Sequence, residues 1–236
     1  MLFGNCYYEI MPQRKIILTS GEIYHVFNRG VNRMPIFSTP NDFMRFIDLI
    51  MYYRYANTPV SFSNFKKRKV EQKEQIMQML EKGNDLCVEI LAFCLMDNHY
   101  HFLLKQITEQ GVSSFVSNMQ NGYAKFYNMK NNRSGPFFQP MFKVVRIETD
   151  EQMLHVSRYI HLNPVTNYVV SVRNLSKYPW FSFGCYTDDL SGFEFVRTSR
   201  ILDMAGGKEK YKNFVYDQID YQREISKIRH LTLDQK

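Results

Sequence analysis

The stretch 87–106 constrains the fold of this chain more than any other. Its first nine residues are almost all apolar and have the length of a strand, Asp97 and Asn98 then supply turn chemistry, and the chain returns as a second strand. Side chains alternate between the two faces of a strand, so His99 and His101 point the same way. The sequence therefore predicts a β-hairpin with two imidazoles on one face of a sheet.

Two imidazoles side by side are half of a divalent-metal site, because neutral histidine is a common metal ligand. The simpler alternative is a pair of polar residues on a solvated strand face. The pair His99 and His101 does not decide between these alternatives, and the rest of the chain must.

Composition narrows the class of partner. The chain has 236 residues and a formal net charge of +7, which favours a polyanionic partner, nucleic acid rather than a membrane. No apolar stretch is long enough to span a bilayer and the N-terminus lacks a signal-peptide layout, so we expect a cytoplasmic, nucleoid-associated protein. The four cysteines contain no Cys-x-x-Cys pair, which disfavours a zinc knuckle and a disulfide framework.

Apolar periodicity over the rest of the chain predicts an alternation of strands and helices. We expect strands over 21–28, 87–95, 99–106 and 142–147, and helices over 40–55, from 111 through 127, and from Thr149 to about Asn163, with a polar insertion near 58–85 that holds a short helix. Thr149 and Gln152 form a capping box at the start of the last helix, and Pro164 should end it. This order predicts an α+β fold, an antiparallel sheet with packed helices.

Tyr159 and Asn163 are four residues apart on that last helix and therefore share one face. A tyrosine hydroxyl has a pKa of about 10 and needs a nearby cation to attack a phosphodiester. A metal at His99 and His101 would supply that cation, with Asn163 as a neutral oxygen ligand. The alternatives are a half-buried packing tyrosine and an asparagine that ends the helix.

Three motifs, taken in order, resemble the single-tyrosine HUH transposases, in particular the insertion-sequence-200-like enzymes and the REP-associated tyrosine transposases. The resemblance covers roughly residues 18 to 186 and includes an aromatic and serine-rich tail at 178–183. The motifs are Tyr24-His25-Val26 with Arg29-Gly30, Met96-Asp97-Asn98-His99-Tyr100-His101, and Tyr159-Ile160-His161-Leu162-Asn163-Pro164-Val165.

The resemblance implies a ferredoxin-like HUH endonuclease sandwich that cleaves and rejoins single-stranded hairpin DNA. By the same resemblance, Tyr159 is the nucleophile and forms a 5'-phosphotyrosine, and His99, His101 and Asn163 bind Mg2+ or Mn2+. A replication-initiator-like nicking enzyme and a catalytically idle DNA-binding relative are the alternatives. Monomer and homodimer both stay open, as does whether Tyr159 serves the metal of its own chain or of a partner.

The resemblance also divides the chain into an N-terminal lead-in (1–17), the HUH domain (18–186) and a C-terminal helical extension (187–236), which has Tyr211, Val215 and Ile219 at helical spacing. Salt-sensitive phosphate contacts should come from lysine and arginine. The candidates are Arg29, Arg33, Lys125, Lys130, Arg133, Lys143 and Arg146, and less convincingly the run Lys66 to Lys69.

Three other histidines qualify this interpretation. His155 lies one turn before Tyr159 and could contact the metal or a phosphate, although a packing or solvated role is simpler. His161 is rotated away from Tyr159 and is assigned no catalytic role. His25, in the first strand, is interpreted as structural or as lining the DNA path.

Overall fold

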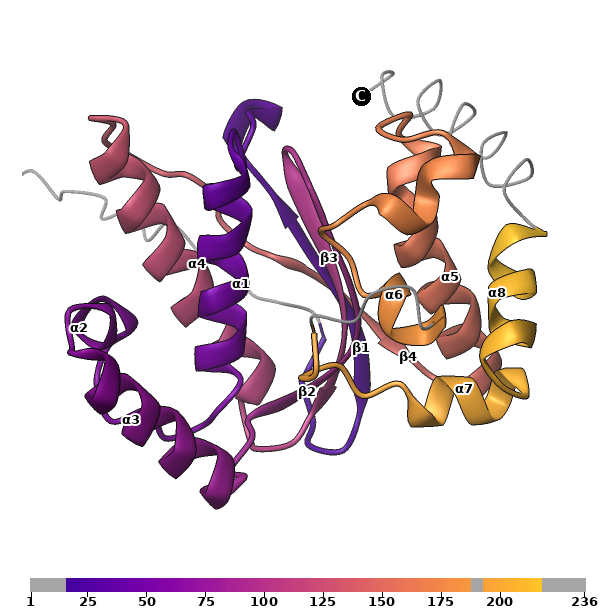
Figure 1. Ribbon diagram of the computed structural model, residues 1–236, viewed down its shortest axis with the longest axis horizontal. Coiled ribbons are helices and arrows are strands. Elements are labelled where there is room, and N and C mark those ends of the chain that lie inside the picture. The colour runs from indigo at the N-terminus through magenta and orange to yellow at the C-terminus, as the bar shows by residue number, and fades with distance from the viewer. Residues whose placement is uncertain (1–15, 188–192, 218–236) are drawn as a thin grey trace, which may run out of the picture.

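The computed structural model describes residues 16–187 and 193–217, and its centre is a four-stranded antiparallel sheet (Figure 1). The strand order is β2-β3-β1-β4, which is the order of a ferredoxin-like sheet. The α+β fold expected from the sequence is therefore confirmed. The strands are β1 (Ile23–Arg29), β2 (Val88–Met96), β3 (His99–Gln106) and β4 (Lys143–Ile147).

Helices cover both faces of the sheet, with α1 and α4 on one side and α5, α6 and α8 on the other (Figure 1). The α-helices are α1 (Pro40–Tyr53), α2 (Phe62–Lys66), α3 (Val70–Gly83), α4 (Gly111–Lys130), α5 (Asp150–Thr166), α6 (Phe183–Thr187), α7 (Ser199–Ala205) and α8 (Lys208–Tyr216), and two 3-10 turns are η1 (Val31–Arg33) and η2 (Val172–Lys177). No helix among the described residues is long and apolar enough to cross a membrane.

Strand alternation separates the side chains of β3 between these two layers. Tyr100 is fully buried on the α1 and α4 side, where its hydroxyl accepts a hydrogen bond from Gln120 Nε2 of α4 at 2.7 Å. His101 faces the opposite side, and its ring lies 5.6 Å from the ring of Tyr159 on α5. The predicted hairpin and its alternation are thus present in the fold.

Helix α5 begins as predicted but ends later than predicted. Thr149 Oγ1 accepts the Gln152 N–H at 3.1 Å, which is the first half of the predicted capping box. The Gln152 Oε1 atom accepts the N–H of Glu148, one residue before the cap, at 2.9 Å instead of the Thr149 N–H. The predicted end near Asn163 is wrong, because the helix runs through Pro164 to Thr166. Proline removes only one helical N–H, and the Asn167 N–H still bonds to the Asn163 carbonyl at 3.0 Å while the last turn is buried.

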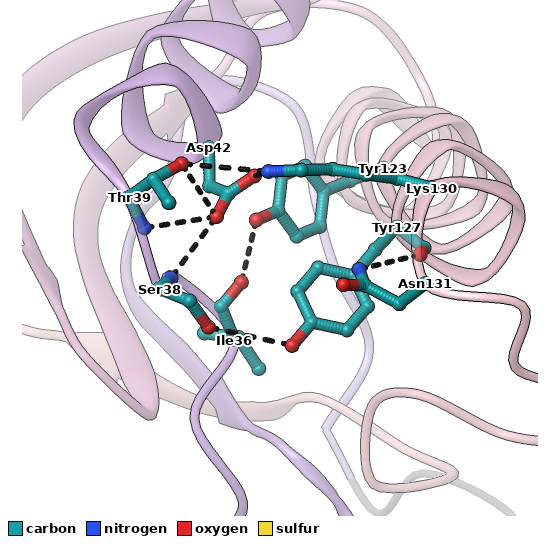
Figure 2. Close-up of polar contacts among 8 residues, drawn as sticks. All are labelled: Ile36, Ser38, Thr39, Asp42, Tyr123, Tyr127, Lys130 and Asn131. Atoms are coloured by element: carbon teal, nitrogen blue, oxygen red, sulfur yellow. Dashed lines mark hydrogen bonds and ion pairs between the residues drawn. The ribbon is translucent and has the colours of Figure 1, made fainter.

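A buried carboxylate joins the start of α1 to the end of α4. Asp42 accepts the backbone N–H groups of Ser38 and Thr39 at 3.1 and 2.9 Å and pairs with Lys130 Nζ of α4 at 2.7 Å (Figure 2). Tyr123 of α4 donates its hydroxyl to the Ile36 carbonyl in the same network. Helix α4 therefore holds the segment 36–42 in place.

That segment in turn contacts the hairpin turn that precedes the histidine pair. The N–H groups of Ile36 and Phe37 both donate to the Asp97 carbonyl, at 2.6 and 2.9 Å. The Gly30 N–H donates to the Asn98 carbonyl at 3.0 Å, and a Cβ at Gly30 would collide with the Met34 carbonyl. The turn before β3 is thus fixed by backbone contacts from the loop after β1.

The aromatic tail 178–183 lies along the outer strand β2. The Leu95 N–H donates to the Trp180 carbonyl at 2.9 Å, and the Tyr178 hydroxyl donates to the Leu95 carbonyl at 2.6 Å. Ser182 Oγ accepts the Phe93 N–H at 2.8 Å. These bonds satisfy the edge of the sheet, which would otherwise expose unpaired backbone groups.

The C-terminal helices pack on α5. Arg158 of α5 lies over the ring of Phe214 of α8 at 4.1 Å, and Tyr211 of α8 is fully buried. The helix expected through Tyr211 and Val215 is therefore α8, while Ile219 lies outside the described residues, as does the lead-in up to residue 15.

Candidate active site between β3 and α5

The histidine pair, Tyr159 and Asn163 come together between the sheet and α5 of one chain. The rings of His99 and His101 have centroids 5.1 Å apart and are nearly perpendicular. Tyr159 lies edge-on to His101 at 5.6 Å and to His25 of β1 at 5.9 Å. The Asn163 side chain hydrogen bonds to His99. Residues from three elements thus form one cluster.

The local fold brings the helix residues to this cluster. Only two residues separate β4 from α5, so the helix must pack back on its own sheet. Within α5, Asn163 Nδ2 donates to the Tyr159 carbonyl at 2.9 Å, and Asn163 Oδ1 accepts from Asn167 Nδ2 at 3.3 Å. These bonds orient the Asn163 amide, which is only 2% exposed.

Burial keeps the site histidines neutral. It lowers the pKa of His99 to about 4, with a further contribution from the Arg29 charge, and the hydrogen bond that protonated His99 donates to Asn163 only partly offsets this. Burial, together with His99, His25 and Arg29, also holds the pKa of His101 well below its usual value. Both imidazoles therefore keep a free nitrogen lone pair at neutral pH, as metal ligands require.

Two neighbours of the pair were missed as site residues by sequence reasoning. Asn98, interpreted only as a turn residue, places Oδ1 2.6 Å from His99 Nδ1. His25 places Nε2 3.0 Å from His101 Nδ1, and its own pKa is lowered by burial to about 4. The sequence predicts which face of β1 carries His25, because side chains alternate along a strand. It does not predict the pairing of β1 with β3, in which Phe27 lies opposite His101 and His25 comes close to it.

The two other described histidines of α5 lie outside the cluster. His155 Nδ1 is 2.7 Å from a guanidinium nitrogen of Arg158, and its ring contacts Phe214 of α8. His161 is fully buried between the Tyr211 hydroxyl and Ser182 Oγ, each at 2.8 Å. Both therefore contact the C-terminal helices rather than the histidine pair in the described part of the chain.

Three of the candidate DNA-binding cations lie near the cluster. Arg29 ends β1 and its charge acts on both His99 and His101. Arg33 follows in η1, where its carbonyl accepts from Asn98 Nδ2 at 3.3 Å. Lys143 is exposed on β4 opposite Phe27, which in turn pairs with His101.

The other four cations lie elsewhere or are engaged. Lys125 and Lys130 belong to α4, on the opposite side of the sheet, and Lys130 is paired with buried Asp42. Arg133 bonds to Asn128 Oδ1 and the Pro136 carbonyl within its own loop. Arg146 pairs with Glu22 at 2.9 Å. Only some of the lysine and arginine residues expected to bind DNA therefore lie near the histidine cluster.

The donor set fits a divalent cation of intermediate hardness. Two neutral imidazoles and one amide oxygen are ligands that such ions accept, and all three side chains belong to one cluster. No carboxylate or thiolate takes part: among the described residues, no three His, Cys, Asp or Glu side chains are grouped to hold a metal. Because these three ligands are neutral, they leave the positive charge of the ion uncompensated. The ion would then attract an anionic substrate such as a phosphodiester.

A ferredoxin-like sheet with two histidines on one strand, faced by a tyrosine and an asparagine on a helix, defines the class of HUH sandwich proteins. Residues 57–163 match the family model described as "Transposase IS200 like". This part of the chain, which holds the histidine pair, Tyr159 and Asn163, is similar to the insertion-sequence-200-like transposases. The family resemblance found in the sequence is therefore confirmed.

A solved structure has the same fold. It is described as "Structure of the REP associates tyrosine transposase bound to a REP hairpin"; it is 18% identical to this chain, with a TM-score of 0.51, and the match covers 81% of this chain and 96% of that chain. The chain matches no curated protein sequence. The likeness supports the assignment of the fold over most of the described residues.

Proposed function

We propose that this protein is a metal-dependent single-stranded DNA endonuclease and strand transferase, a transposase that acts on hairpin DNA through a 5'-phosphotyrosine. The observation that carries the proposal is the placement of Tyr159 against His101 while Asn163 bonds to His99, all in one chain. The match of residues 57–163 to the transposase family model supports a transposase activity. The similar solved structure is bound to a REP hairpin, which supports hairpin DNA as the substrate.

In the proposed reaction, Tyr159 attacks the scissile phosphate, and the other three residues of the site hold the metal ion. Tyr159 forms an Oη–P bond at the scissile phosphate, the P–O3' bond breaks, and the phenolic proton is balanced by protonation of the leaving 3'-oxygen. Because the phosphodiester energy is kept in the phosphotyrosine, a 3'-hydroxyl can later reverse the step at a second junction. His99, His101 and Asn163 would hold Mg2+ or Mn2+, which would polarise a non-bridging phosphate oxygen.

Cations around the cluster would hold the DNA. Arg29 lies on β1, the strand next to the histidine pair, Lys143 lies on β4 beyond it, and Arg33 lies on the loop that contacts Asn98. Phosphate contacts of this kind weaken with added salt. We include Lys125, Lys130, Arg133 and Arg146 only as peripheral contacts.

The test is to incubate the protein with Mn2+ and labelled single-stranded hairpin DNA from the sequence flanking its own gene. We expect a covalent protein–DNA adduct in the wild type and none in Tyr159→Phe, because phenylalanine has no nucleophilic oxygen. Tyr168→Phe, just beyond the end of α5, is the matched control and should keep the adduct. An adduct that persists in Tyr159→Phe would contradict the nucleophile.

The same assay tests the metal site and the transfer step. Chelation, His99→Ala and His101→Ala should each reduce adduct formation by at least about 100-fold, since several kcal/mol of charge stabilisation would be lost. A second labelled junction should be joined to the cleaved strand. Cleavage without joining would instead favour the nicking enzyme.

A further inference from the structure

Each histidine of the pair has its Nδ1 atom engaged by a neighbouring side chain. The partner of His99 is Asn98 Oδ1 at 2.6 Å, and the partner of His101 is His25 Nε2 at 3.0 Å. The two nitrogens of an imidazole lie on different sides of the ring, so a contact at Nδ1 turns Nε2 away from that partner. In His101 the second nitrogen is therefore left for another ligand. The His99 ring also hydrogen bonds to the Asn163 side chain, and a cation bound by His99 and Asn163 together would replace that bond.

The direction of the Asn98 bond follows from its second contact. Asn98 Nδ2 donates to the Arg33 carbonyl at 3.3 Å, and a carbonyl can only accept. The Oδ1 atom must then be the group that faces His99, and it too can only accept. His99 therefore carries its proton on Nδ1 and has its lone pair on Nε2.

The His25 bond has the same consequence when a cation is present. The rings of His25 and His101 are stacked, with centroids 5.2 Å apart, and the two side chains are only 9% and 5% exposed. Two neutral imidazoles share one proton in such a bond. A cation on His101 Nε2 requires that proton on His101 Nδ1, so His25 Nε2 must accept it.

We propose that Asn98 and His25 are positioning residues that fix the Nδ1–H form of His99 and His101 and thereby present two Nε2 lone pairs to one divalent cation. The inference rests on the proposed function for the identity of the ligand. His25 is assigned a positioning role rather than a ligand role, because its Nε2 is directed at His101. Partners that orient metal-bound histidines typically contribute 10- to 100-fold in metal affinity.

The His25 contribution is tested with two variants that differ in hydrogen-bond capacity. His25→Phe keeps a ring of similar shape and removes the acceptor, whereas His25→Gln keeps an acceptor oxygen. We expect Mn2+ affinity, measured by electron paramagnetic resonance or calorimetry without DNA, to fall by about 10-fold or more in His25→Phe. His25→Gln should recover most of the loss.

The Asn98 contribution is tested in parallel with Asn98→Ala and Asn98→Asp. Alanine removes the acceptor and should weaken Mn2+ binding by about 10-fold or more, while aspartate keeps an acceptor next to His99 Nδ1 and should bind Mn2+ at least as well as the wild type. Thermal unfolding of all four variants, compared with the wild type, shows whether each one is folded.

The tautomers are measured directly on the wild type, so the test does not depend on the folding of a variant. In 15N-histidine-labelled protein with saturating Mg2+, NMR should show His99 and His101 protonated at Nδ1, and His25 unprotonated at Nε2. Protonation of His99 or His101 at Nε2, or Mn2+ affinity within 2-fold of wild type in His25→Phe and Asn98→Ala, would overturn the inference and leave the proposed function standing. A wild-type chain that binds neither Mn2+ nor Mg2+ would overturn both.

Discussion

Two histidines six residues apart on α5 have opposite environments. His155 is exposed and bonds to Arg158, whereas His161 is fully buried between Tyr211 and Ser182. Helical rotation alone predicts that His161 points away from Tyr159. Its burial depends on α6 and α8, which the helical spacing of α5 does not encode.

Burial of His161 should make stability depend on pH. Its pKa falls to about 3 because burial penalises the charged ring, so below the unfolded value of 6.5 the unfolded chain binds a proton that the folded chain does not. The contribution is full above pH 6.5 and is lost as the pH falls toward 3, by about 2 kcal/mol at pH 5.

Urea unfolding at pH 7.5 and pH 5 measures this contribution. His161→Gln cannot titrate, so its stability should fall about 2 kcal/mol less than that of the wild type between the two pH values. His155→Gln on the same helix is the matched control. An equal fall in the wild type and His161→Gln would refute the assignment.

At the scale of elements, α1 offers two aspartate–lysine pairs, one buried and one partly exposed to solvent. Asp42 is 0% exposed in its side chain and pairs with Lys130 of α4, while Asp48 is 34% exposed and pairs with Lys66 of α2 at 2.9 Å. Burial raises the pKa of Asp42, but bonds from Lys130 and the segment 38–39 outweigh it and lower the pKa overall. The buried carboxylate thus anchors α1 to α4 (Figure 2).

We expect Asp42→Asn to destabilise the protein by about 2 kcal/mol, because charged hydrogen bonds to buried groups are lost. Asp48→Asn, the matched control, should cost less than about 1 kcal/mol, since an exposed pair is screened by solvent. Denaturant unfolding at pH 7.5 compares them. A cost for Asp42→Asn no larger than that for Asp48→Asn would contradict the anchoring role.

Element boundaries were predictable where a local signal exists. The strand beginning at His99 and the helix starts at Pro40, Gly111 and Asp150 agree with turn, proline and capping signals. The end of α5 was not predictable in this way, because the steric preference before Pro164 is a local bias and the burial of the last turn outweighs it.

At the scale of the whole molecule, α5 is held in its own chain from both sides. Only two residues connect it to β4, and α8 packs on its outer face through Arg158 and Tyr211. An exchange of α5 between two chains would require this two-residue connection to reach across to the partner, and it would disturb the packing of α8 on α5. Tyr159 is therefore expected to act on DNA held by the histidine pair of the same chain.

Mixing two inactive variants tests this arrangement. Tyr159→Phe and His101→Ala, made with tags of different size, should form no adduct together, because neither chain has both parts of the site. Tagged wild-type chains are the control. An adduct on the His101→Ala chain in the mixture would show that the tyrosine serves a partner's site.

The sequence by itself determined which side chains share a face. His99 and His101 on a strand, and Tyr159 and Asn163 on a helix, follow from backbone periods that neighbouring residues set locally. The tertiary structure decided which faces meet. His25 and His101 are 76 residues apart in sequence, Lys130 pairs with Asp42 rather than remaining open to DNA, and α8 covers α5, because contacts of such separation depend on how the whole core packs.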